Sequence, residues 1–302
     1  MGELLHLKQA TVASHPDILA IDAAHSVAFH RGLGESISDV PYEKYVNAQA
    51  LSEFAQTAYS KPNVAVVSSG ADAADVSKWV GEFFKGLPGQ GTAGPYSVQK
   101  AEPSKYYGGE ARIASKAGSV VVLGFPGSST FGTPGYKPEV SVLATLLGGE
   151  STIKWTPGFT LLAKAAEGFP GVQVSTKSHA YSDAGLLTVT VSGKADQIGA
   201  ASKGVVETIK KVAAGEIPAE DIKKAAALAK FRALETVENI GSGLEATGSA
   251  LLNGAKPYHA GEIAQAIDSV TADQVKNVSI FNRKTVPFIN DREQYTLPRS
   301  RS

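Results

Sequence analysis

The stretch from Leu146 to Val191 constrains the fold more than any other part of the chain. Its first half reads Leu-Leu-Gly-Gly-Glu-Ser-Thr-Ile-Lys-Trp-Thr-Pro-Gly-Phe-Thr-Leu-Leu-Ala-Lys, which predicts a helix end, a glycine-bearing loop and a second helix. After a Gly/Pro break, apolar and polar residues alternate over 172–176, as in a half-buried strand. Residues 182–185, Ser-Asp-Ala-Gly, have turn chemistry, and the apolar run 186–191 follows. We therefore expect two strands that meet at a turn and pack against helices.

Helices and a few strands are predicted on both sides of this stretch. The helix that begins at Asp72 has the best-defined apolar stripe, and it places Trp79 in the core. A short buried strand is expected over Val64–Ser68. The other expected elements are helices over residues 3–34, 48–61, 139–147, 196–214, 218–234, 245–252, 261–270 and 272–278, and strands within 112–125 that include the run Val-Val-Val-Leu at 120–123.

A linker is predicted where glycine, proline, serine and glutamine replace apolar residues. It covers residues 88–109 and divides the 302-residue chain into a first unit, 1–87, and a second, 110–278. Strands and helices recur on both sides, which favours α+β domains over a doubly wound sheet. The first unit has one convincing strand, too few for a sheet, so we expect it to be incomplete. Residues 279–302 have no sustained period and are expected to form a disordered tail.

Composition excludes several classes of function. Lysine plus arginine and aspartate plus glutamate number 29 each, so no net charge favours nucleic acid or anionic lipid. The absence of cysteine excludes disulfides, thiolate metal sites, iron–sulfur ligation and a cysteine nucleophile. No apolar run approaches the roughly 20 residues needed to span a bilayer. Any association with a membrane must then come through a protein partner.

Two motifs carry a resemblance to a known family. The Gly-Gly-x-Ser-x-x-Lys-Trp loop at 148–155 and the Ser-Asp-Ala-Gly-Leu-Leu-Thr turn at 182–188 form one match. The segment 21–34, Ile-Asp-Ala-Ala-His-Ser-Val-Ala-Phe-His-Arg-Gly-Leu-Gly, forms the other. Over residues 10–278 the chain resembles the M16 (mitochondrial processing peptidase-like) family, and within it the fungal core protein 2 branch of the cytochrome bc1 complex (complex III). The motifs occur in the family's order and spacing.

The resemblance implies a fold, a role and partners. The fold is α+β, M16 peptidase-like (LuxS/MPP-like), with a mixed sheet backed by helices and an incomplete first domain, as in an N-terminally truncated product. The role is that of a non-catalytic structural subunit, peripheral to the mitochondrial inner membrane on the matrix side. Its partners would be core protein 1, cytochrome b and cytochrome c1. The alternatives are a zinc metallopeptidase or processing-peptidase subunit of the same family, and a non-functional fragment with exposed strand edges.

His25 and His30 are the candidate ligands for the zinc metallopeptidase alternative. Active M16 peptidases use His-x-x-Glu-His on a helix, in which two histidines four residues apart share a face and a glutamate acts as base. His25 and His30 are five residues apart, about 140° from a shared face, with no carboxylate between them. We expect both to be packing or capping residues. The sequence gives no catalytic, cofactor-binding or metal-binding residue, and no cofactor.

The remaining candidates also favour structural roles. His179 lies near Asp183 without a serine of triad character, so a hydrogen-bonded or solvent-facing role is expected, and His259 is given none. Gly148-Gly149 lacks the glycines, the Lys-Ser/Thr pair and the preceding strand of a phosphate loop, which favours a fixed structural loop. Trp155, in that loop, is interpreted as an interface anchor.

Overall fold

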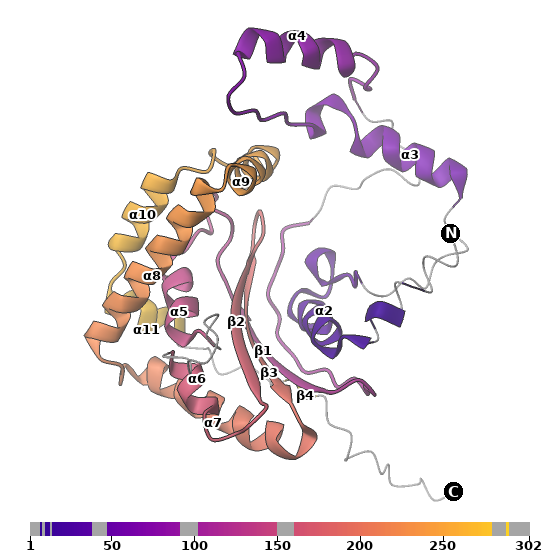
Figure 1. Cartoon of the computed structure of the whole chain (residues 1–302). Coiled ribbons are helices and arrows are strands. Elements are labelled where there is room, and N and C mark those ends of the chain that lie inside the picture. Colours follow the sequence, from indigo (N-terminus) through magenta and orange to yellow (C-terminus); the bar gives the residue numbers. More distant parts are fainter. Residues whose placement is uncertain are drawn as a thin grey trace, which may run out of the picture.

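A four-stranded sheet with helices on both faces forms the centre of the computed structural model (Figure 1). The structure describes residues 7, 10–12, 14–37, 47–90, 102–149, 160–279 and 288–289. The strands are β1 (Ser119–Pro126), β2 (Gln173–Ala180), β3 (Gly185–Gly193) and β4 (Phe288–Ile289), in the order β2-β3-β1-β4. The predicted α+β, M16-like class is confirmed. Each described strand pair is antiparallel, however, where a mixed sheet was expected.

The predicted pair of strands forms the β2–β3 hairpin. Its register runs from Gln173 opposite Ser192 to Ala180 opposite Gly185, and the backbone N–H of Tyr181 donates to the carbonyl of Ala184 at 2.9 Å. The turn at 182–185 is therefore where the sequence predicted it. Strand β1 covers only the second half of the predicted 112–125 region, because Val120–Leu123 is the part with a continuous apolar run.

One face of the sheet is covered by most of the helices after β1. They are α5 (Pro138–Leu147), α6 (Leu161–Ala166), α7 (Ala195–Ala214), α8 (Ala219–Glu238), α10 (Ala260–Asp268) and α11 (Ala272–Ser279), and α9 (Ile240–Leu252) follows α8 at one end (Figure 1). Leu123, Leu187 and Val189 point from the sheet into this core. The predicted helices over these residues are confirmed, with boundaries shifted by a few residues. Gly215 ends α7 in the left-handed conformation, φ 80°, that favours glycine at a helix end.

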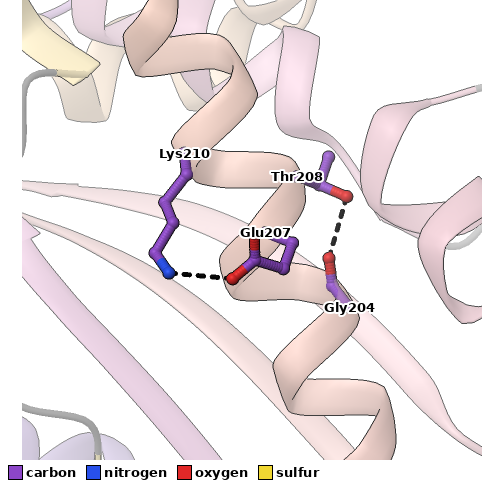
Figure 2. Close-up of polar contacts among 4 residues, drawn as sticks. All are labelled: Gly204, Glu207, Thr208 and Lys210. Carbon is purple, nitrogen blue, oxygen red and sulfur yellow. Dashed lines mark hydrogen bonds and ion pairs between the residues drawn. The ribbon is translucent and has the colours of Figure 1, made fainter.

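In helix α7 the apolar residues lie on the buried face and charged residues lie on the exposed face (Figure 2). Its buried residues recur at helical spacing, from Ile198 to Val212. The Glu207 carboxylate accepts a hydrogen bond from Lys210 Nζ at 2.8 Å on the solvent side. The Thr208 hydroxyl donates to the Gly204 carbonyl at 2.9 Å. The exposed ion pair contributes at most about 1 kcal/mol, so buried apolar contacts hold the helix in place.

Helix α2 (Pro16–Phe29) covers the opposite face of the sheet. Its small residues Ala20, Ala24 and Ala28 pack with Val120 and Val122 of β1, in a second apolar cluster. The short helix η1 (Gly32–Gly34) follows α2. By position α2 belongs to the predicted first unit, yet it packs on the sheet of the second.

The predicted linker also packs against the sheet over its second half. The Tyr106 hydroxyl donates to the carbonyl of Gly124 in β1, and the backbone N–H of Tyr107 donates to the carbonyl of Ala28 in α2. Burial raises the pKa of Tyr106. Residues 102–109 thus fasten α2 to the sheet, and the division into units at 88–109 stays a prediction.

One predicted strand is absent from the described part of the chain, and one short strand is present where none was predicted. Val64–Ser68 has no strand structure, although it lies between α3 (Ala48–Ala58), η3 (Lys61–Asn63) and α4 (Ala73–Phe83). An apolar run needs neighbouring strands to pair with, and none of the four described strands pairs with this one. In the predicted disordered tail, Phe288–Ile289 pairs with Val121 and Val122 as β4. Of the rest of that tail only Ser279, the last residue of α11, is described, and the disorder of the tail stays a prediction.

Candidate interaction surface

His25 is a structural residue by its contacts. Its ring is 9% exposed on α2, with Nδ1 2.8 Å from the Ile21 carbonyl and Nε2 2.7 Å from the Tyr181 hydroxyl. Both nitrogens therefore have hydrogen-bond partners. His30 follows α2 with φ 64°, and its ring lies 4.6 Å from that of Tyr107. Within the described residues, no group of three or more His, Cys, Asp or Glu side chains could hold a metal ion.

His179 joins His25 across the interface between β2 and α2. The two rings meet edge-on, with centroids 5.1 Å apart, and His179 Nε2 is 3.1 Å from the Thr188 hydroxyl. Burial lowers the pKa of His179 to about 4, and the neighbouring His25 and Lys177 act in the same direction. A neutral imidazole at physiological pH suits packing against a second ring. Sequence reasoning did not predict this contact between His25 and His179, because the two residues are distant in the chain.

Gly148 and Gly149 are required by close packing. Gly148 ends α5 with φ 60°, and the Thr160 hydroxyl both accepts from the backbone N–H of Gly149 and donates to its carbonyl. A Cβ on Gly149 would lie 2.2 Å from the carbonyl oxygen of Val174. Residues 150–159, with Trp155, lie outside the described part of the chain, so the interface role of Trp155 stays a prediction.

An exposed apolar face runs over α3, α4 and the segment between them. Neither helix has a buried residue, and Figure 1 shows both away from the sheet. Trp79 is 53% exposed and stacks on Phe83, itself 75% exposed, at 5.7 Å between centroids. The prediction that Trp79 is a core residue is therefore wrong. We call this surface the α3–α4 face, and its large apolar residues are Leu51, Phe54, Tyr59, Val66, Trp79, Phe83 and Phe84.

The caps of both helices are nevertheless well formed. The Asn47 side chain accepts from the backbone N–H of Ala50, and the Asp72 carboxylate accepts from those of Ala74 and Asp75. Asparagine and aspartate are favoured at this position because their side-chain oxygens accept from the free N–H groups of the first turn. The local sequence therefore specifies helices that are amphipathic and complete, while nothing in the described chain covers their apolar side.

A second apolar surface lies on α8 and α9. It consists of Leu228, Phe231, Leu234, Ile240, Leu251 and Leu252, each at least 37% exposed. The two surfaces approach each other where a Cβ on Gly248 of α9 would lie 3.8 Å from the Val67 side chain. Large contiguous apolar patches on soluble proteins mark interaction sites, and exposed aromatic residues are frequent anchors of interfaces. The arrangement is suited to binding another surface.

Comparison with known families gives a match over residues 45–228 to the model described as the Peptidase M16 inactive domain. Among curated proteins, the chain is 43% identical over 275 residues to cytochrome b-c1 complex subunit 2, mitochondrial, of Neurospora crassa. It is 34% identical over 242 residues to the protein of that name from Yarrowia lipolytica. These alignments cover 90% and 80% of this chain, but 59% and 55% of the relatives. The chain thus spans a little over half of their length.

A solved structure supports the same fold. The chain is similar to one in complex III2 from Candida albicans with Inz-5 bound, with a TM-score of 0.80. The match covers 96% of this chain and 70% of the other at 15% identity. None of the helices in the described residues is both long and apolar enough to cross a membrane.

Proposed function

Because the chain belongs to the family of the Peptidase M16 inactive domain, we propose that it is a non-catalytic structural subunit of the mitochondrial cytochrome b-c1 complex. The proposal rests on the α3–α4 face, whose exposed aromatic residues have no cover within the described chain. The relatives' name, subunit 2 of that complex, supports the same assignment. The work of such a subunit is to bury surface against its neighbours.

The proposed partners are core protein 1, cytochrome b and cytochrome c1, and the proposed site is the matrix side of the inner membrane. Peripheral attachment through these subunits needs no membrane-spanning segment of this chain. Catalysis is not expected of it. A zinc peptidase would need a ligand set to activate water, and both ring nitrogens of His25 are already occupied by Ile21 and Tyr181.

The test is co-migration with complex III. We expect the tagged chain, expressed in fungal mitochondria, to run with complex III on blue-native gels. Trp79→Ser combined with Phe83→Ser should reduce incorporation by at least about thirtyfold, because a single anchor residue at an interface contributes about 2 kcal/mol or more. Glu82→Ser is the matched control, since it changes an exposed polar residue of the same helix and should incorporate normally.

The surface assignment and the proposed function are contradicted by different results. Equal incorporation of the Trp79/Phe83 double variant would contradict the assignment of the α3–α4 face. A tagged chain that never migrates with complex III would contradict the proposed function as a whole. Stoichiometric zinc in the purified protein, together with cleavage of a presequence peptide, would establish the peptidase alternative instead.

A further inference from the structure

The chain contains one Asn-Gly pair, at residues 253 and 254. An asparagine loses its side-chain amide when the backbone nitrogen of the next residue attacks the side-chain carbonyl carbon. Glycine has no Cβ, so it leaves that nitrogen unshielded. Every other asparagine of the chain is followed by a residue with a side chain. Asn253 is therefore the asparagine most open to this reaction.

The pair forms the C-terminal cap of α9. Asn253 has φ −90° and ψ 10°, and Gly254 follows in the left-handed conformation, φ 67°. The backbone N–H of Gly254 donates to the carbonyl of Leu251 at 3.1 Å. That of Ala255 donates to the carbonyl of Ala250 at 2.9 Å. This is the Schellman arrangement, in which a glycine after the cap lets the last helical carbonyls find donors. The glycine that ends the helix is thus also the residue whose nitrogen can attack Asn253.

Water has access to this cap. Asn253 and Gly254 are both exposed, and no atom of the described chain would lie within 4 Å of a Cβ on Gly254. Asn253 Nδ2 donates to the Ser249 carbonyl at 2.9 Å. This bond and the one from the Gly254 N–H must open before the two residues can react. Helix ends open at a small fraction of the free energy of global unfolding, so the reaction proceeds from the opened last turn of α9.

We propose that Asn253 is a deamidation site, at which water converts the side-chain amide to a carboxylate and the last turn of α9 is released. The Gly254 nitrogen gives its proton to solvent hydroxide and bonds to Cγ of Asn253. The Cγ–Nδ2 bond breaks, and the amide group takes protons from water and leaves as ammonia. Water then opens the cyclic succinimide at Cγ, which gives aspartate, or at the main-chain carbonyl carbon, which gives isoaspartate. One water is consumed and one ammonia is released, and no atom is oxidised or reduced.

Either product weakens the cap. A carboxylate cannot donate to the Ser249 carbonyl, and its charge lies at the negative end of the helix dipole. Isoaspartate also inserts a methylene group into the main chain, which displaces the N–H groups of Gly254 and Ala255 from their carbonyls. Leu251 and Leu252 of this turn belong to the second apolar surface and are 43% and 54% exposed, so the reaction alters that surface. The site is separate from the α3–α4 face, and it goes beyond the proposed assembly role.

The first experiment incubates the full chain in heavy-oxygen water at neutral pH and follows its asparagine-containing peptides by mass spectrometry. The Asn253 peptide should gain heavy oxygen and divide into aspartate and isoaspartate forms. Asn63 is the matched control in the same sample. It is exposed, and its Nδ2 donates to the Thr57 carbonyl at 3.0 Å, but the branched side chain of Val64 follows it. Asn63 should keep its amide over the period in which Asn253 loses most of its own.

The second experiment measures hydrogen exchange at the end of α9 in Asn253→Asp and Asn253→Gln. Asn253→Asp carries the charge of the product, so the backbone amides of Gly254 and Ala255 should exchange about tenfold faster than in the parent. Asn253→Gln keeps a neutral amide, and its reaction would need a larger ring. It should therefore resist deamidation and exchange nearly as slowly as the parent.

Three outcomes would overturn the proposal. One is equal loss of the amide at Asn253 and Asn63. Another is an intact Asn253 in the folded chain under conditions in which the free peptide Ser-Ala-Leu-Leu-Asn-Gly-Ala-Lys reacts, because the cap would then protect the residue. The third is unchanged exchange at Gly254 and Ala255 in Asn253→Asp, which would refute the release of the turn. None of these results depends on incorporation into complex III, so the two proposals fail separately.

Discussion

Protonation of His179 should destabilise the fold as pH falls from about 6.5 to about 4. Burial lowers the pKa of His179 from 6.5 to about 4, with His25 and Lys177 adding to the shift. Between these values the unfolded chain binds a proton at this site that the folded chain does not. Stability therefore rises with pH in this window, is fully present above about 6.5, and is lost towards pH 4.

The size of the effect follows from the shift. Each pKa unit corresponds to about 1.4 kcal/mol, so the full change amounts to about 3 kcal/mol. His179 is only partly buried, and solvent weakens the interaction of its charge with its neighbours. We expect a loss of about 1–2 kcal/mol from this residue across the window.

The measurement is urea unfolding of the parent and of His179→Gln at a series of pH values. Glutamine can keep a hydrogen bond to Thr188 but does not titrate. His179→Gln should be less stable than the parent at pH 7, since it loses the ring contact with His25, and the gap should close by about 1–2 kcal/mol towards pH 4.5. Carboxylates titrate in both proteins, so their contribution cancels in the difference. His259→Asn, which keeps a cap-forming side chain at an exposed position, controls for the loss of one histidine.

A gap that stays constant from pH 7 to pH 4.5 would refute the argument. It would mean that His179 binds its proton equally well in the folded and unfolded chain. The packing of β2 against α2 would then not restrict the charge of this ring.

Three other predictions concern the fold itself. Leu187→Ala, at a fully buried position of β3, should cost about 2–5 kcal/mol of unfolding free energy in urea titrations, whereas Leu228→Ala, 40% exposed, should cost less than about 1 kcal/mol. Gly149→Ala should lower the thermal midpoint, because its Cβ would meet a β2 carbonyl at 2.2 Å, and Gly168→Ala, with open space around it, should not. Asp72→Ala removes the cap of α4 and should cost about 1 kcal/mol of local stability, measured by hydrogen exchange in that helix.

Each of these three predictions would be contradicted by a specific result. Equal costs for the two leucine variants would mean that the buried face of β3 is misassigned. A Gly149→Ala protein as stable as Gly168→Ala would show that the loop can move away from β2. Unchanged exchange in Asp72→Ala would mean that the cap does not limit opening of α4.

The second half of the fold could be predicted because its signals are local. The continuous apolar run at Val120–Leu123 identifies a strand buried on both faces, and the turn residues at 182–185 fix where the hairpin reverses. The α7 stripe ends at Gly215, where a left-handed residue is needed. In each case the pattern and its structural cause lie within a few residues of each other.

The candidate surface could not be predicted in the same way. Periodicity in α4 identifies which side of the helix is apolar, but not whether anything covers it. A signal was nevertheless present, because a segment with a single predicted strand, Val64–Ser68, offers no sheet for the stripe of Trp79 and Phe83.

Helices α2 and α4 differ in what covers their apolar sides within the described chain. In α2, alanines at 20, 24 and 28 let the backbone come close to β1, so the helix is buried by the chain's own sheet. In α4, the corresponding stripe carries the large side chains of Trp79 and Phe83, which are held on a well-capped helix but left in water. Burying two such side chains is worth roughly 3–6 kcal/mol. Since the described sheet is already covered by α2 on one face and by the α5–α11 layer on the other, that free energy is available only through a surface from outside the described chain.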